Sequence, residues 1–91
     1  MNFAWDPRKE GINVEKHGIA FADACRIFED VTIERIDDRF DYGEQRIVAI
    51  GLVDGVYMTV VYTLRGETRR IISARRATRH ERRSWQDANS A

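Results

Sequence analysis

The spacing of hydrophobic residues divides this chain into a short helical portion and a longer portion that favours strands. Apolar residues recur at the i, i+3, i+4 and i+7 positions of one helical face at Phe21, Ala24, Cys25 and Phe28. From residue 46 to residue 75, runs rich in β-branched and aromatic residues are interrupted only by short turn signals. The pattern predicts a small α+β domain in which helices precede a sheet.

The strand-like portion predicts an antiparallel meander of three strands, at about Arg46–Val53, Val56–Leu64 and Thr68–Arg75. Asp54-Gly55 is the strongest turn signal in the chain and fits a two-residue type I′ hairpin. Arg65-Gly66 predicts a weaker second turn.

Period-two alternation assigns the side chains of this meander to two faces. One face, which we expect to be the core, carries Val48, Ile50, Leu52, Val61, Ile72 and Ala74. The other, which we expect to be mixed, carries Ile47, Met58, Val60, Tyr62, Arg69, Ile71, Ser73 and Arg75. A one-residue change at the second turn would move the last strand's side chains to the opposite faces.

Capping signals define the helices. Asp6-Pro7 supplies an N-cap and a proline at the first helical position, and His17-Gly18 closes a helix that runs from about Pro7 to Lys16. Thr78 and Glu81 have the spacing of a capping box, which begins a final helix from about Arg79 to Ala88.

Shorter segments complete the expected fold. Phe3-Ala4-Trp5 predicts a first strand, Val31 and Ile33 alternate with polar residues as in a strand, and residues 37–43 read as an acidic loop. The whole chain, residues 1–91, is then one domain with two N-terminal helices, an antiparallel sheet and a C-terminal helix.

Composition limits the class of protein. A chain of 91 residues with 43% hydrophobic residues can build one core without disulfides or metal. The lone cysteine, Cys25, lies in an apolar helical pattern and is expected in that core. No apolar run approaches 18 residues and no leader-like segment is visible, so we expect a cytoplasmic protein that does not enter a membrane.

The net charge of zero conceals two opposite halves. Residues 1–64 hold seven basic and twelve acidic residues, whereas residues 65–91 hold eight basic and three acidic ones. Seven arginines fall between residues 69 and 83, around the expected junction of the last strand with the capped helix. Guanidinium groups and helix N-termini both suit phosphate oxygens, so the expected ligand is a polyanion.

The chemistry that these residues favour is RNA cleavage through the RNA's own 2′-OH. The chain has no familiar cofactor or metal motif, and we expect neither. The reaction needs a base, an acid, and cations that stabilise charge on the phosphate. Glu44 or His17 is a possible base, and His17, Tyr62 or Lys16 a possible acid or second cation. Phosphate clamps are expected at Arg46, Arg75, Arg76 and Arg79. Further RNA contacts are expected at Arg65, Arg69, Arg79 and Arg82.

Each of these residues also has a simpler interpretation. His17 beside a glycine is common at helix C-termini, Glu44 can pair with Arg46 across one strand face, and Tyr62 fits a core or rim position. The arginines can be solvated faces with a few carboxylate partners. The alternative function is therefore a non-catalytic, arginine-rich module that binds nucleic acid or an acidic protein.

Several motifs, in order along the chain, resemble the BrnT family of bacterial type II toxins. They are Phe3-Ala4-Trp5-Asp6 with Lys9, Asn13 to Ile19 around Lys16-His17-Gly18, Gly43-Glu44-Gln45-Arg46, Val61-Tyr62-Thr63, and Ile71 to Thr78 with Glu81-Arg82. The resemblance covers nearly the whole chain. It implies a RelE-like fold and a metal-independent endoribonuclease that arrests translation.

The same resemblance implies a protein partner. A BrnA-type antitoxin with a ribbon-helix-helix DNA-binding domain would hold the toxin inactive in a hetero-oligomer. That complex would repress its own promoter, so operator DNA would be reached only through the antitoxin. An expression test separates this reading from the binding-module alternative, because only a free toxin should stop growth.

Overall fold

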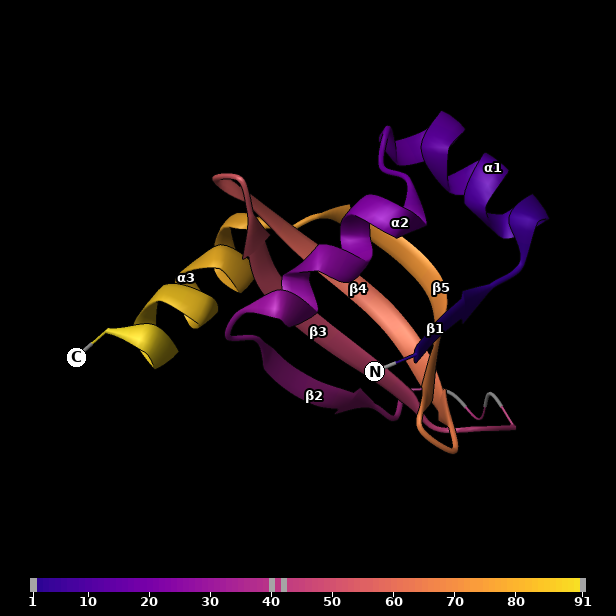
Figure 1. Cartoon of the computed structure of the whole chain (residues 1–91). Helices are drawn as coiled ribbons and strands as arrows, with labels where there is room; N and C mark the ends of the chain where they lie inside the picture. Colours follow the sequence, from indigo (N-terminus) through magenta and orange to yellow (C-terminus); the bar gives the residue numbers. More distant parts are fainter. Residues whose placement is uncertain (1, 40, 42, 91) are drawn as a thin grey trace.

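A computed structural model, which describes residues 2–39, 41 and 43–90, shows a five-stranded sheet with helices on both sides (Figure 1). The elements in chain order are β1 (Asn2–Trp5), α1 (Pro7–His17), α2 (Phe21–Ala24), the 3₁₀-helix η1 (Cys25–Glu29), β2 (Ile33–Asp37), β3 (Arg46–Val53), β4 (Val56–Arg65), β5 (Thr68–Arg76) and α3 (Arg79–Asn89). The strand order is β1-β5-β4-β3-β2, antiparallel except that β1 runs parallel to β5. The expected α+β fold is confirmed. Two residues of the expected acidic loop, Phe40 and Tyr42, lie outside the described residues.

The capping and turn signals are mostly confirmed. Asp6 caps α1 and Gly18 ends it in the left-handed conformation, with φ of 69°. Asp54 and Gly55 both have positive φ, 50° and 80°, as a type I′ turn requires. The second turn is displaced by one residue, because Arg65 pairs with Thr68 and the turn is formed by Gly66 and Glu67.

A β-bulge in β5 overturns the expected division of faces. Tyr62 pairs with Ile71, but the preceding residue, Val61, pairs with Ser73, so Ile72 has no partner on β4. The side-chain alternation therefore shifts by one residue at Ile72. Arg69 and Ile71 share a face with Tyr62 as expected, whereas Ser73 and Arg75 lie on the opposite face.

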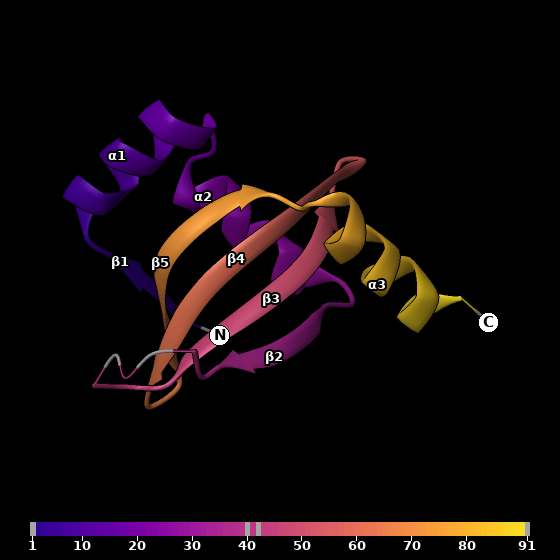
Figure 2. The same cartoon turned by 180° about the vertical axis from the view of Figure 1, so that it is seen from behind.

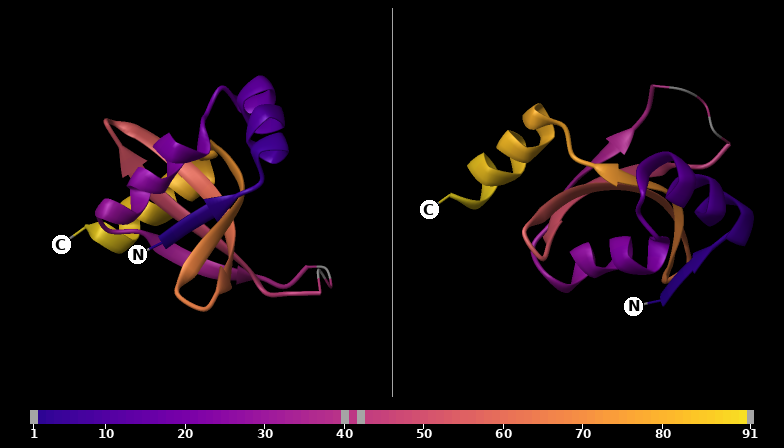
Figure 3. Two further views of the ribbon diagram at one scale, coloured as in Figure 1. Left: turned by 45° about the vertical axis from the view of Figure 1, so that its right-hand side comes forward. Right: turned by 90° about the horizontal axis from the view of Figure 1, so that it is seen from above.

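The main core also lies on the face that the sequence pattern marked as mixed. We call it the core face. It contributes Ala49, Val60, Tyr62, Ile71 and Ala74, which pack under α2 and η1 (Figure 3). Gly51 permits this contact, since a Cβ at that position would lie 2.7 Å from Ile27 Cβ. Of the residues that the sequence pattern assigned to the core, Ala74 lies on the core face, whereas Val48 and Ile50 are buried on the opposite face of the sheet.

No helix lies over most of that second face, which we call the open face (Figure 2). Only α3, among the helices of the described residues, packs on it, at one end. Trp85 fixes α3 there: its indole N–H donates to the Val31 carbonyl over 3.1 Å, and its ring packs edge-on against Tyr57. Trp85 thus anchors α3 to the sheet.

A buried side chain, Asn13, attaches α1 to the edge of β5. β1 pairs with β5 only as far as Ile71, which leaves the backbone of Ala74 beyond its reach. The Asn13 side-chain amide pairs with this backbone in place of β1: it donates to the Ala74 carbonyl over 2.8 Å and accepts from the Ala74 N–H over 3.1 Å. The last turn of α1 is therefore held beside the bulge.

Candidate functional site

Arginines from three strands gather on the open face. Arg35 on β2 lies in one row of cross-strand pairs, which continues through Val48 on β3 and Val61 on β4 to Ser73 on β5. In the next row, Arg46 on β3 pairs with Asp37, while Arg70 on β5 pairs with Thr63. Arg75 is on the same face, opposite Thr59. These arginines surround the apolar centre formed by Val48 and Val61.

A fifth arginine reaches this surface from the end of β2. Arg39 binds the buried Asp37 with two hydrogen bonds, from Nε over 2.9 Å and from Nη2 over 3.0 Å. Its positive charge acts on Arg75 and opposes the rise in the pKa of Arg75 that Glu81 causes. We call Arg35, Arg39, Arg46, Arg70 and Arg75 the arginine face.

Glu81 joins the arginine face to α3. Arg75 donates to both carboxylate oxygens of Glu81, over 2.6 Å and 2.9 Å, and the Thr78 N–H donates over 2.8 Å. Burial alone would raise the pKa of Glu81, but the hydrogen bonds from Arg75 and Thr78 and the charge of Arg75 lower it to about 2. The predicted capping box is confirmed, and it also holds Arg75.

The end of α1 forms one border of the open face. Lys16 and His17 line an open hollow of about 190 Å³ together with Ser73, Ile72 and neighbouring residues of α1. Ser73 belongs to the open face, so both predicted residues lie at its rim. The two hydrogen bonds between Asn13 and the Ala74 backbone keep this end of α1 against β5.

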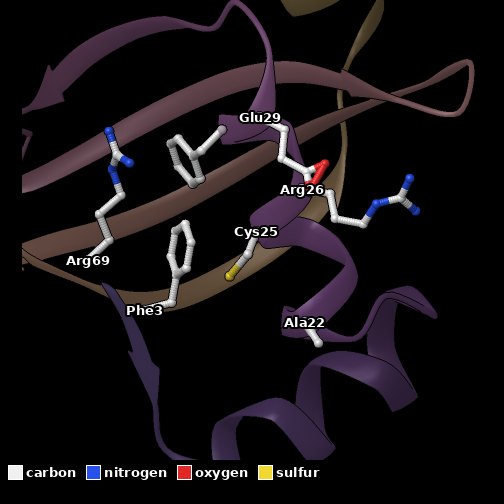
Figure 4. Close-up of a pocket in the computed structure, with 7 residues that line it drawn as sticks. Phe3, Ala22, Cys25, Arg26, Glu29 and Arg69 are labelled. Atoms are coloured by element: carbon white, nitrogen blue, oxygen red, sulfur yellow. The ribbon is translucent and has the colours of Figure 1, made fainter. Parts of the chain in front are cut away.

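Two other predicted residues lie on the core face instead. The Tyr62 side chain is buried and its hydroxyl donates to Glu34 over 2.9 Å. Burial and the bond to Glu34 raise the pKa of Tyr62, although Arg69 opposes the rise. Arg69 lies 4.1 Å from the centre of the Phe28 ring and lines a cavity of about 470 Å³ with Phe3 and Cys25 (Figure 4). Neither residue joins the arginine face.

The remaining predicted residues lie at the two ends of the sheet. At one end, Glu44 and Arg65 form an exposed ion pair of 3.4 Å. At the other, Arg76 and Arg82 line a small hollow beside Tyr57, and Arg82 lies over the Tyr57 ring at 5.7 Å. Arg79 is exposed in the first turn of α3.

The lone cysteine, Cys25, lies in the core as the sequence predicted. It is buried, and burial raises the pKa of its thiol to about 11, so the thiol is protonated near neutral pH.

No group of three His, Cys, Asp or Glu side chains that could hold a metal ion occurs within the described residues. Among the helices of that part of the chain, none is long and apolar enough to cross a membrane.

Known proteins share both the sequence pattern and the fold of this chain. Residues 5–81 match the family model described as the ribonuclease toxin BrnT of type II toxin–antitoxin systems. The chain belongs to the BrnT family. The crystal structure of the Brucella abortus ribonuclease toxin BrnT superposes with a TM-score of 0.66 and 29% sequence identity, covering 87% of this chain and 99% of that one. A search of the curated proteins gives no match.

Membership of the BrnT family confirms the resemblance drawn from the motifs and gives the class of activity, that of a ribonuclease toxin of a type II system. The sequence pattern missed three members of the arginine face: Arg35, Arg39 and Arg70. Arg70 stood within the arginine cluster, but the face of its strand was uncertain. Arg35 and Arg39 lie far away in sequence and join the face only through the pairing of β2 with β3.

Proposed function

We propose that the protein is a metal-independent endoribonuclease toxin whose RNA substrate lies across the arginine face. The proposal rests on one observation, which is that five arginines gather on a sheet surface that helices leave uncovered. Guanidinium groups in a fixed fork match phosphate oxygens, and an exposed sheet gives an extended strand room to lie flat. Family membership supports RNA as the polyanion.

The proposed reaction is transesterification within the RNA. The 2′-oxygen attacks the adjacent phosphorus, a base accepts the 2′-proton, and the bond from phosphorus to the 5′-oxygen breaks as an acid protonates the leaving oxygen. The products are a 2′,3′-cyclic phosphate and a 5′-hydroxyl. Arg46, Arg70 and Arg75 would stabilise the negative charge that builds on the phosphate oxygens.

Of the predicted acid and base candidates, Lys16 and His17 are best placed. They border the open face beside Ser73, whereas Tyr62 is buried on the core face and Glu44 pairs with Arg65 at the sheet end. Histidine changes charge between pH 5 and 8, which suits proton transfer near neutrality. We assign proton transfer to His17 and a supporting positive charge to Lys16.

Family membership supports a protein partner for the toxin. We propose a BrnA-type antitoxin with a ribbon-helix-helix domain, which neutralises the toxin in a cytoplasmic hetero-oligomer and brings it to operator DNA. Free toxin would then inhibit translation. The excess of basic residues from position 65 onward supports docking of an acidic segment there.

The central experiment is RNA cleavage by the purified free protein in excess EDTA. We expect fragments with 5′-hydroxyl ends at a rate unchanged by EDTA, because arginines supply the charge stabilisation. Cleavage that stops in EDTA and returns with a divalent ion would contradict metal independence. RNA binding without cleavage, and growth unaffected by expression of the free chain, would favour the binding-module alternative.

The role of His17 is tested by the pH dependence of the same assay. Replacing His17 with glutamine should lower the rate by about 10²–10⁴, the usual contribution of a general acid or base. It should also change the shape of the pH–rate profile. If the variant keeps the wild-type rate and profile, His17 serves only as the end of α1.

A further inference from the structure

A second cavity opens beside the arginine face, where α3 leaves the sheet. It has a volume of about 310 Å³ and is lined by Ile33, Glu34, Arg35, Val48, Ile50, His80, Glu81 and Ser84. No motif in the sequence predicts this cavity. It lies between β2 and β3 on one side and the first two turns of α3 on the other.

The cavity has an apolar floor and a polar rim. Val48 and Ile50, which are 3% and 5% exposed, come from the open face, and Ile33 extends the floor onto β2. Arg35 and His80 are exposed residues at the rim, one on the sheet and one on the helix. Flat guanidinium and imidazole groups are the kind of surface on which unstacked bases lie.

The cavity is continuous with the proposed phosphate-binding surface. Arg35 belongs to both, and Glu81 lines the cavity while it holds Arg75 over 2.6 Å. A phosphate held by Arg75 would therefore place its own nucleotide next to the opening. The volume is near the lower end of the range for small-ligand pockets, about 300 Å³ and upward, which favours one base over two.

We propose that this cavity receives a single nucleobase of the RNA, turned out of the strand next to the scissile phosphate, and thereby sets the sequence preference of cleavage. Ser84 is the polar group best placed to read the base edge: its hydroxyl donates to the His80 carbonyl over 3.0 Å and keeps its lone pairs as acceptors. This inference rests on the proposed ribonuclease function and adds a recognition site to it.

The test fills the cavity from the helix side. Ser84→Phe adds a ring at the rim, and Ala88→Phe, one turn further along α3 at an exposed position outside the cavity lining, adds the same ring as a control. Cuts are mapped on an RNA pool with a randomised segment. Wild type and Ala88→Phe should discriminate at least tenfold between bases at one position beside the cut, and Ser84→Phe less than about twofold.

A binding measurement makes the result independent of cleavage. Oligonucleotides that carry a 2′-deoxy group at the cut site and one 2-aminopurine at varied positions should change fluorescence at a single position, and this change should be lost in Ser84→Phe. His80→Ala, at an exposed site, should weaken both signals if Ser84→Phe fails to fold.

The outcomes separate the two proposals. Cleavage by wild type without any base preference, or a preference retained in both cavity variants, would overturn the base site and leave the ribonuclease proposal standing. Absence of cleavage by wild type would contradict the ribonuclease proposal, and the fluorescence signal would still decide the base site. Variants that bind RNA normally but no longer bind the antitoxin would assign the cavity to a side chain of that partner.

Discussion

Replacing Arg70 with alanine should reduce RNA cleavage by about 10²–10³, the usual cost of removing one donor to a developing oxyanion. Arg70 lies on the open face, half-buried beside Thr63, and no ion pair holds its guanidinium within the described residues. Its charge is therefore available to a phosphate. Single-turnover cleavage of a defined RNA at saturating protein measures the effect.

The controls distinguish chemistry from folding. Arg70→Lys keeps the charge but loses the planar fork, so it should recover only part of the rate. Arg83→Ala, at an exposed position of α3, removes the same charge elsewhere and should stay within about twofold of wild type. Full activity in Arg70→Ala, with Tm unchanged, would remove Arg70 from the site.

Replacing Glu81 with alanine should destabilise the fold by about 3 kcal/mol, the lower part of the range for breaking a buried ion pair. The Glu81 side chain is 11% exposed, and its loss leaves Arg75, which is 37% exposed, without its partner and the N-terminus of α3 without half of its capping box. For a domain of this size, the fall in Tm should exceed about 10 °C.

The same carboxylate predicts acid sensitivity. Because folding lowers the pKa of Glu81 from 4.5 to about 2, its contribution is fully present above pH 4.5 and is lost as the pH falls toward 2. The loss should be about 2–3 kcal/mol in denaturant unfolding. Glu81→Gln should show a much flatter profile over that interval. An identical profile in this variant would mean that other carboxylates dominate acid unfolding.

Local signals in the sequence predicted most of the fold. The Asp54-Gly55 turn, the Asp6 and Gly18 caps and the capping box at Thr78 each depend on a few adjacent residues, and the structure contains all of them. The choice of core face depended on the whole sheet instead. Both faces are apolar near the centre, so alternation alone did not show which one α2 and η1 would cover.

The candidate site was less predictable for the same reason. Arg46 and Arg75 share a surface because two hairpins and a bulge align them, and Arg35 joins them from a strand that follows the helices. Tyr62 looked equally suitable in the sequence, yet its strand turns it toward Glu34 under η1. Residue type indicated the chemistry, and only long-range pairing indicated which residues could act together.

The bulge at Ile72 decides which surface the second half of β5 presents. Because of one extra residue, a single strand presents Arg69 to the core side and Ser73 and Arg75 to the open side. Regular pairing of the same residues, with Ile72 opposite Val61, would turn Ser73 and Arg75 to the core side and would take Arg75 away from Glu81. A chain that lacks Ile72 should instead keep the present partners of Ser73 and Arg75 on β4, so the same arginine surface is compatible with a bulged strand and with a strand that is one residue shorter.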